Sequence, residues 1–325
     1  MSIIEKAIEK LNAEQAGKQD GLADNVDRPL DPARDPQVSG HAPVEPQDDG
    51  PAPTFEQPQE SPAVKPNGKI IDLPLDRLKL LGMVTPDDPR SRIAEENRII
   101  KRPLLMNIAG KGATTVDNPN LIMVTSAQSG EGKTFTALNL AISIAMEQDK
   151  TVLFVDADVA KASAAALLGI PDDYPGLIDL LMDNGTKIRD VLLHTSIPNL
   201  RVLPAGHAHE RSTELLASAG MQRLMAELAQ RYPDRVIIFD SPPILFTTEA
   251  GVLASLMGQI VFVVAETQTP QGKVVEALSH LGSEKIIGLL LNKSTNRGNG
   301  ADGYGFGYGY GYGYGYGYKR DRKNN

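Results

Sequence analysis

The sequence predicts an α/β protein with a mostly parallel β-sheet that carries helices on both faces. Short apolar runs, typical of strands buried on both sides, alternate along the chain with amphipathic helical patterns. The first run, residues 121–124, leads into a glycine-rich segment and then into apolar residues at helical spacing (Leu138, Ala141, Ile142 and Ala145). Because ligands of such sheets bind at the carboxyl ends of the strands, we expect functional residues there.

Three segments precede this pattern. Residues 1–15 have the spacing of a short amphipathic helix, although a frayed terminus explains them as well. Residues 16–68 contain ten prolines and few large apolar side chains, which predicts a disordered, acidic linker. Residues 69–118 are expected to form a helical arm with two short helices, the second over about 91–102, and Pro103 ends or kinks that helix.

The second helix of the arm carries a regular charge pattern. Glu95, Arg98 and Lys101 recur every three residues. A solvated helical face with one Glu–Arg pair is the simple explanation for this spacing. A contact with another protein chain is the functional alternative.

The segment 127–134 reads Ala-Gln-Ser-Gly-Glu-Gly-Lys-Thr and is typical of a phosphate-binding loop between a strand and a helix. Gly130 and Gly132 let the backbone approach a polyphosphate, and amides at the helix start point at its oxygens. Lys133 adds positive charge and Thr134 can bind Mg²⁺, whereas a plain connecting turn needs neither residue. The predicted nucleotide-binding residues are Ala127, Gln128, Ser129, Gly130, Glu131, Gly132, Lys133, Thr134, Phe135 and Asn292.

Acidic residues end two further predicted strands. Residues 151–155 lead to Asp156 and Asp158, and residues 236–239 lead to Asp240. A strand-ending Asp is often only a helix cap, but beside a phosphate loop it is the expected partner of Mg²⁺. Asp156 and Asp158 are expected to divide metal binding and proton acceptance between them.

The remaining predicted elements complete one domain over residues 119–293. They are strands at 200–203, 260–264 and 286–291 and helices at 213–217, 221–230, 249–256 and 271–281.

The last segment, 294–325, is predicted to be a flexible tail. From residue 303 to 318 glycine alternates with aromatic residues, and a basic cluster follows at 319–323. A low-complexity adhesive or sheet-forming segment is one explanation. Beside a nucleotide site, the phenols on a flexible chain are candidate phosphoryl acceptors: Tyr304, Tyr308, Tyr310, Tyr312, Tyr314, Tyr316 and Tyr318.

Composition excludes several classes of protein. The chain has 325 residues, of which 41% are hydrophobic, with a net charge of −8 and a pI of about 5.2, which does not suggest nucleic-acid binding. It has no cysteine, so disulfides, thiol catalysis and thiolate metal sites are excluded. No run approaches the length of a membrane span, and the charged N-terminus does not resemble a signal peptide. We therefore expect any membrane association to depend on a partner.

Taken together, these residues resemble the bacterial tyrosine autokinases of exopolysaccharide and exosortase-associated loci, a branch of the P-loop ATPases related to the partitioning ATPases. The similarity covers about 91–325. Residues 127–134, 153–158 and 236–243 match the family's three nucleotide motifs, and the tail tyrosines match its acceptor cluster.

Two positions depart from the family pattern. Glu95, Arg98 and Lys101 match its Glu-x-x-Arg-x-x-Arg oligomerisation helix, except that Lys101 replaces an arginine. Ala160 and Lys161 follow the second motif where the family most often has Arg, so a bidentate contact made by that Arg is not expected here.

The resemblance implies ATP-dependent phosphorylation of tail tyrosines on a neighbouring subunit, which regulates polysaccharide chain length, polymerisation and export. Lys133 would hold the β- and γ-phosphates, Thr134 and Asp158 would bind Mg²⁺ with support from Asp240, and Asp156 is the candidate base. The implied partners are further copies of the chain, a membrane-spanning chain-length-determinant protein as activator, and a phosphotyrosine phosphatase. The implied location is cytoplasmic, at the inner membrane through that activator.

Two other functions fit parts of the sequence. A partitioning or positioning ATPase would switch between monomer and dimer, but those relatives carry a signature lysine where this chain has Gln128 and Ser129. The other hypothesis is a non-enzymatic, ATP-gated scaffold of a polysaccharide assembly. Guanine specificity is not expected, because residues 292–295 read Asn-Lys-Ser-Thr and lack the acidic residue of an Asn-Lys-x-Asp motif.

Overall fold

The fold comes from a computed structural model that describes residues 69–112, 115–182, 185–231, 235–282 and 285–294. The chain divides into two units, Met1–Lys293 and Ser294–Asn325, and all described residues except Ser294 belong to the first. The predicted N-terminal helix, the proline-rich linker and the tyrosine tail therefore lie outside the described residues.

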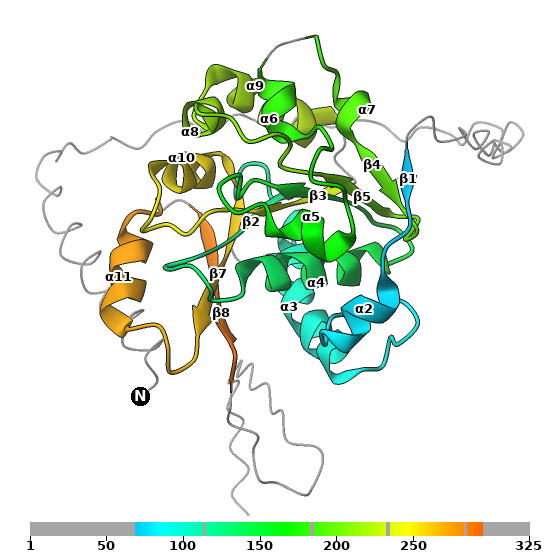
Figure 1. The fold of residues 1–325 in the computed structure, drawn as a ribbon. Helices are drawn as coiled ribbons and strands as arrows, with labels where there is room; N and C mark the ends of the chain where they lie inside the picture. Colours follow the sequence, from blue (N-terminus) through cyan, green and yellow to red (C-terminus); the bar gives the residue numbers. More distant parts are fainter. Residues whose placement is uncertain (1–68, 113–114, 183–184, 232–234, 283–284, 295–325) are drawn as a thin grey trace, which may run out of the picture. The chain divides into compact units, whose positions relative to one another are not determined.

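Among the described residues, eight strands form one sheet in the order β1-β4-β5-β3-β6-β2-β7-β8 (Figure 1). Neighbouring strands are parallel, except that β4 and β5 run antiparallel. The strands are β1 (Ile70–Ile71), β2 (Leu121–Ser126), β3 (Thr151–Asp156), β4 (Leu193–Thr195), β5 (Leu200–Leu203), β6 (Arg235–Asp240), β7 (Gln259–Ala265) and β8 (Ile286–Asn292). The predicted mostly parallel α/β sheet is confirmed.

Helices cover both faces of this sheet. They are α2 (Leu75–Leu80), α3 (Arg92–Ile108), α4 (Lys133–Ala145), α5 (Ser163–Leu168), α6 (Leu177–Leu181), α7 (Ile188–Val191), α8 (Ser212–Leu216), α9 (Ala219–Arg231), α10 (Thr248–Leu256) and α11 (Gln271–Ser279). The short elements β1, β4, α5, α6 and α7 were not predicted, because segments of so few residues show no periodic pattern.

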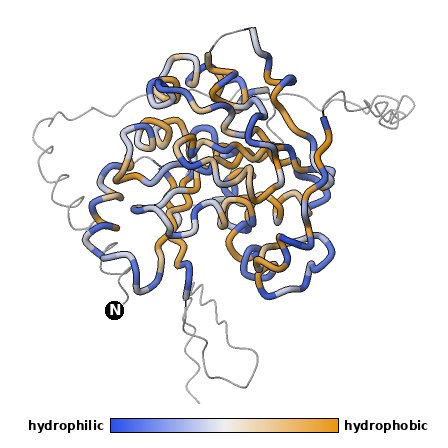
Figure 2. The backbone as a smooth tube through the Cα atoms, in the orientation of Figure 1, coloured by the Kyte–Doolittle hydropathy of each residue, from blue (hydrophilic) through white to orange (hydrophobic). Residues whose placement is uncertain are grey.

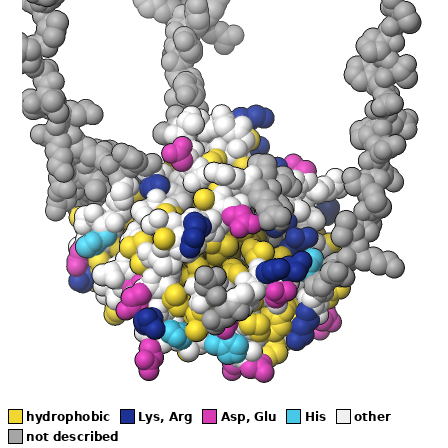
Figure 3. All heavy atoms as spheres, turned by 90° about the horizontal axis from the view of Figure 1, so that it is seen from above, with side chains coloured by type: hydrophobic (Ala, Val, Ile, Leu, Met, Phe, Trp, Pro, Cys, Tyr) yellow, Lys and Arg dark blue, Asp and Glu magenta, His cyan; other side chains and the backbone are white. Residues whose placement is uncertain are grey.

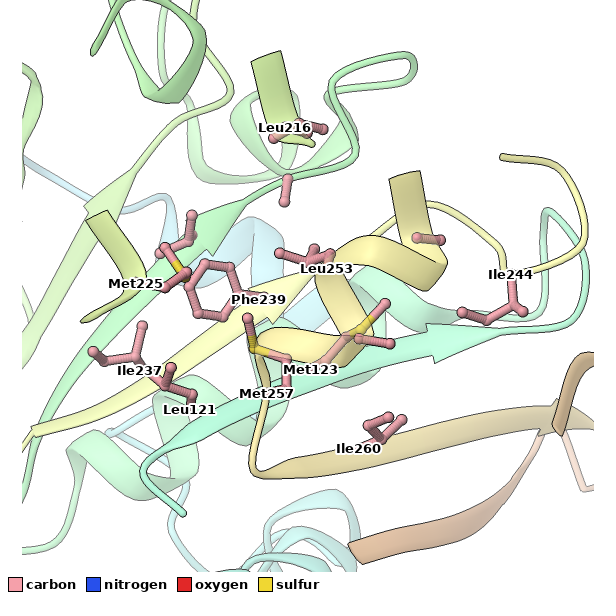
Figure 4. Packing of buried hydrophobic residues seen from close by; sticks show 14 of the residues in the cluster. Leu121, Met123, Leu216, Met225, Ile237, Phe239, Ile244, Leu253, Met257 and Ile260 are labelled. Atoms are coloured by element: carbon pink, nitrogen blue, oxygen red, sulfur yellow. The ribbon is translucent and has the colours of Figure 1, made fainter. Parts of the chain in front are cut away.

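Alternate residues of the central strands point to opposite faces of the sheet, as strand geometry requires. In β2, Leu121 and Met123 join one buried cluster with helices α6 to α11, whereas Ile122 and Val124 join a second cluster with α2 to α5. Figure 4 shows the first cluster, in which Leu121 and Met123 lie beside residues of β6 and α10. Figure 2 shows the same concentration of apolar residues along the inner strands.

The segment from β1 to the end of α3, residues 70–108, packs on this core and does not stand apart from it as an arm. The strand β1 pairs with β4 at the edge of the sheet, with Ile70 opposite His194. The helices α2 and α3 contribute Leu78, Ala94 and Leu104 to the second buried cluster. Apolar burial therefore ties this segment to the sheet.

Pro103 was expected to end or kink the second helix, and the first alternative is wrong, because α3 continues to Ile108 with Pro103 inside it. The residues beyond the proline are fastened to the core. Leu104 is buried, and the side-chain amide of Asn107 donates to Oε1 of Gln259 at 2.7 Å. These contacts offset the one backbone hydrogen bond that a proline removes from a helix.

Candidate active site

The segment 127–132 joins the end of β2 to the first residue of α4, which is the strand–loop–helix arrangement of a phosphate-binding loop. Gly130 and Gly132 have φ angles of 82° and 96°, in the left-handed region that favours glycine. A Cβ atom on Gly132 would lie 2.1 Å from Nδ2 of Asn292. The backbone conformation therefore favours glycine at position 132, and any larger residue would also have to displace the Asn292 side chain.

A buried carboxylate holds this loop in shape. Glu131 is only 4% exposed; its Oε2 accepts from the amide of Gln128 at 2.7 Å, and its Oε1 accepts from the hydroxyl of Thr269. The side chain of Asn292 donates to the carbonyl of Glu131 at 2.9 Å, and Nζ of Lys293 donates to the carbonyl of Gly130 at 2.7 Å. The loop is thus fastened to the end of β8 and to the turn after β7.

Asn292 was predicted from the sequence as a site residue, whereas Thr269 and Lys293 were not. Neither residue belongs to a recognisable motif, and Thr269 reaches Glu131 across 138 positions of sequence. Phe135, counted among the nucleotide-binding residues, is half-buried, and its side chain packs against the second core cluster.

The predicted acidic residues come together at the carboxyl edge of the sheet. The strands β3 and β6 are neighbours, and Asp156 lies opposite Asp240 in their register. Asp158 follows two residues later, and its amide donates to Oδ1 of Asp156 at 3.2 Å. These three carboxylates, expected from the ends of two separate strands, form one cluster.

Lys133 completes this cluster from the start of α4. Its Nζ lies 2.5 Å from Oδ2 of Asp158, and the two side chains are only 6% and 4% exposed. The hydroxyl of Thr134, on the next residue, lies 3.1 Å from the hydroxyl of Ser163. The loop lysine is therefore part of a buried ion pair, a contact that the motif alone did not predict.

Burial changes the proton affinity of the carboxylates. The pKa of Asp156 is raised well above its usual value, chiefly by burial and then by the charges of Asp240 and Asp158. Burial likewise raises the pKa of Asp240 to about 7, against the opposing charge of Lys133. Perturbed carboxyl groups of this kind concentrate at functional sites.

The cluster has free acceptor atoms that fit a hard cation. Oδ2 of Asp156 and both carboxylate oxygens of Asp240 are buried and have no hydrogen-bond partner among the described residues. Within the same part of the chain, no group of three or more His, Asp or Glu side chains is arranged to hold a metal on its own. This combination fits Mg²⁺, which binds through one or two carboxylates and keeps waters and phosphate oxygens as its other ligands.

The three residues of the proposed oligomerisation helix do not share one exposed face. Glu95 and Arg98 form an exposed ion pair, and Arg98 also donates to the carbonyl of Pro89 at 2.7 Å. Lys101 is only 7% exposed; its Nζ donates to the carbonyl of Ser143 at 2.6 Å and lies 2.5 Å from Glu147. Lys101 therefore binds the C-terminal end of α4 within its own chain, which corrects the expectation that it faces a neighbour.

A second surface feature lies away from the loop. Leu181, Met182 and Leu215 line a shallow pocket between α6 and α8, with polar groups from His209, Arg211 and Glu214. Figure 3 shows the face on the α8 and α9 side, where basic, acidic and histidine side chains surround exposed apolar ones. None of the pocket residues belongs to the phosphate loop or the carboxylate cluster, so we assign the pocket no role.

None of the helices in the described ranges is long and apolar enough to cross a membrane.

Comparison with known proteins agrees with this geometry. Residues 120–283 match the family model of an AAA domain. CapB of Staphylococcus aureus, provisionally named a tyrosine-protein kinase, is 30% identical over 209 residues, which are 64% of this chain and 87% of CapB. The tyrosine-protein kinase YwqD of Bacillus subtilis is 29% identical over 207 residues, 63% of this chain and 83% of YwqD.

The similarity extends to longer relatives and to solved structures. The tyrosine-protein kinase wzc of Salmonella typhi is 31% identical over 187 residues, or 57% of this chain, but the match spans only 25% of wzc. The kinase domain of the Escherichia coli tyrosine kinase ETK superposes with a TM-score of 0.57 at 26% identity, covering 68% of this chain and 83% of that domain. The VpsO kinase domain gives a TM-score of 0.52 at 29% identity, covering 64% and 98%. The chain therefore belongs to the AAA-domain family of P-loop ATPases and, within it, to the bacterial tyrosine-protein kinases.

Proposed function

We propose that this chain transfers the γ-phosphoryl group of ATP to tyrosines in the tail of a neighbouring copy. The observation that carries this proposal is the buried group of Lys133, Asp156, Asp158 and Asp240 beside a strand–loop–helix phosphate site. The names of the relatives as tyrosine-protein kinases support the reaction type. The proposed acceptors are Tyr304, Tyr308, Tyr310, Tyr312, Tyr314, Tyr316 and Tyr318.

Lys133 has two alternative partners in this mechanism. In the structure its ammonium group forms an ion pair with Asp158. The phosphate oxygens of ATP are a second anionic partner for the same group. We propose that Lys133 moves to the β- and γ-phosphates when ATP binds. Asp158 is then released from its ion pair and becomes available near Thr134, where both can contribute to a metal site.

The carboxylates then take different roles. We propose that Thr134 and Asp158 hold Mg²⁺ with Asp240 in support, and that the ion, when bound, neutralises charge on the phosphate oxygens. The acceptor phenol must lose its proton as its oxygen bonds to the γ-phosphorus and the bond to the β-phosphate oxygen breaks. Asp156 is our candidate for that proton, because its raised pKa makes it a stronger base than an ordinary carboxylate.

Transfer between copies requires assembly. We propose that the exposed residues Glu95 and Arg98 of α3 contact a neighbouring subunit. Lys101 is not part of this contact surface, because it is buried within its own chain. The further proposed partners are a membrane-spanning activator of the chain-length-determinant class and a phosphotyrosine phosphatase. With these partners the protein would act on the cytoplasmic side of the inner membrane and regulate exopolysaccharide polymerisation and export.

Incubation of the full chain with ATP labelled on the γ-phosphate tests the reaction type. We expect labelled phosphotyrosine in the tail, measured by acid-stable incorporation and mass spectrometry. Release of free phosphate without phosphotyrosine would instead indicate a positioning-type ATPase. Nucleotide binding with neither product would indicate a scaffold.

A mixing experiment tests the direction of transfer. The donor is a full chain whose seven tail tyrosines are replaced with phenylalanine, and the acceptor is an isotopically labelled Lys133→Met chain whose folding is checked by circular dichroism. We expect phosphate on the labelled acceptor. Its absence, when the wild-type chain labels itself, would confine transfer to a single chain.

A further inference from the structure

One aromatic side chain in the described part of the protein has no place in the core. Of the six Phe and Tyr residues there, Phe154, Phe239 and Phe262 are fully buried, and Phe135 and Tyr174 are half-buried. The sixth, Phe246, is 65% exposed. A single exposed apolar side chain is ordinary on a protein surface, so the position of this ring in the fold decides whether a role in binding is worth testing.

Phe246 lies on a turn that is fixed to the strand leading into the phosphate loop. Phe246 follows Asp240 by six residues. The turn that carries it is held by the amide of Ile244, which donates to the carbonyl of Ser126 at 2.9 Å. Ser126 is the last residue of β2, and Figure 4 shows Ile244 beside the end of that strand. The amide of Phe246 closes the turn by donating to the carbonyl of Pro243 at 3.2 Å.

These contacts place the ring at the edge of the sheet where the chemistry is proposed. Phe246 follows Ile244 by two residues, which span at most about 7 Å of chain. The side chain of Ile244 is buried and Leu245 packs against the first core cluster, so the turn has anchors other than Phe246. The exposed ring therefore stands on a fixed base near the start of the phosphate loop.

The proposed substrate has an unusual composition around its acceptors. Every acceptor tyrosine from Tyr308 to Tyr316 has glycine on both sides, and so does Tyr304. Glycine offers no side chain for recognition, so such a substrate brings only its phenol rings and its backbone. Aromatic rings pair favourably in stacked or edge-to-face arrangements, beyond the gain from burying their area.

We propose that Phe246 is a specificity-determining residue that packs against a tail tyrosine of a second copy of this chain. This inference rests on the proposed function, because it assigns a binding contact to the same transfer reaction. The ring would hold the acceptor, or the tyrosine next to it, near the carboxylate cluster. The basic residues 319–323 that follow the repeats complement the acidic site and favour the same approach.

Steady-state transfer to the labelled Lys133→Met chain tests this contact. The enzymes compared are the full-length wild type, Phe246→Ala, Phe246→Tyr and the control Leu80→Ala, which removes an apolar side chain that is 89% exposed on α2. We expect Phe246→Ala to raise the KM for the acceptor chain roughly three- to tenfold, as loss of one aromatic pair implies. The kcat at saturating acceptor should be retained, Phe246→Tyr should restore the KM, and Leu80→Ala should match the wild type.

The possible outcomes separate this inference from the proposed function. If the wild type labels no tyrosine, the proposed function fails. If the wild type labels the acceptor and Phe246→Ala leaves its KM unchanged, Phe246 does not recognise the tail. A fall in kcat without a change in KM, or a loss of oligomer mass in light scattering, would show that Phe246 acts in subunit packing and would also overturn the inference.

Discussion

Replacing Lys133 with methionine should abolish phosphoryl transfer and, in addition, destabilise the protein. A loop lysine that served only the phosphates would be dispensable for folding. In the structure, however, its ammonium lies 2.5 Å from Asp158, and both side chains are almost fully buried. Lys133→Met fills the same space without the charge and leaves the carboxylate of Asp158 without its cation.

The size of the effect follows from this burial. Removing one partner of a buried ion pair costs about 3–5 kcal/mol, because the other charge stays desolvated. We therefore expect Lys133→Met to lose about 3–5 kcal/mol of unfolding free energy at pH 7. For a domain of this size, that lowers the Tm by about 6–20 °C.

Urea unfolding without added nucleotide, followed by circular dichroism, measures this loss. The matched partners are Asp158→Asn and the double variant, which together with Lys133→Met make a double-mutant cycle. We expect the double variant to recover about 2 kcal/mol or more relative to the sum of the single losses, because it removes both charges of the Lys133–Asp158 pair. Lys273→Met, which breaks an exposed pair with Glu276, should cost less than about 1 kcal/mol.

If Lys133→Met is as stable as the wild type at pH 7, or the cycle gives no coupling, the buried pair does not contribute to stability and the reasoning is wrong.

Three further predictions follow from other contacts. Because the pKa of Asp240 is raised from 3.8 to about 7, its ionisation should remove up to about 4 kcal/mol of stability as the pH rises from about 4 through 7. Asp240→Asn should flatten that part of the stability curve in urea unfolding while lowering kinase activity, and an unchanged curve would contradict the assignment. Lys101→Met should destabilise the chain by about 1–3 kcal/mol, because it leaves the carbonyl of Ser143 without its donor, while Glu147 stays partly solvated. It should leave the oligomer mass in light scattering unchanged, whereas Arg98→Ala should lower the mass. The reverse pattern would show that Lys101 belongs to the interface. Gly132→Ala forces a left-handed φ of 96° on alanine and crowds the side chain of Asn292. It should therefore weaken the binding of ATP, measured by calorimetry, by about 1–3 kcal/mol. Binding as tight as that of the wild type would show that the loop can rearrange freely.

Local patterns predicted the central elements well. The apolar runs of β2, β3 and β6 are buried along nearly their whole length, so their composition alone marks them as inner strands. The glycines, lysine and threonine of the phosphate loop follow from backbone and charge requirements within eight consecutive residues. Asp156 and Asp240 were predictable because each ends such a strand, and parallel strands share one carboxyl edge.

Contacts between distant segments were not predictable in this way. The spacing of Glu95, Arg98 and Lys101 describes one helix, but it does not say which side α4 covers. The covered side is that of Lys101, which reaches the carbonyl of Ser143. The exposure of Phe246 is likewise a property of its turn and its neighbours, since the sequence around it is as apolar as a buried segment.

The α/β class, the phosphate loop and the acidic strand ends can be predicted from the sequence, because they depend on residues close together in the chain. The partners that these residues meet follow only from the folded structure. Asp158 pairs with Lys133, Thr269 donates to Glu131, and the side chain of Asn292 lies against Gly132. The physical reason is that strand order and register, which bring β3, β6, β7 and β8 to the loop, are set by the packing of the whole sheet and leave no local pattern in the sequence.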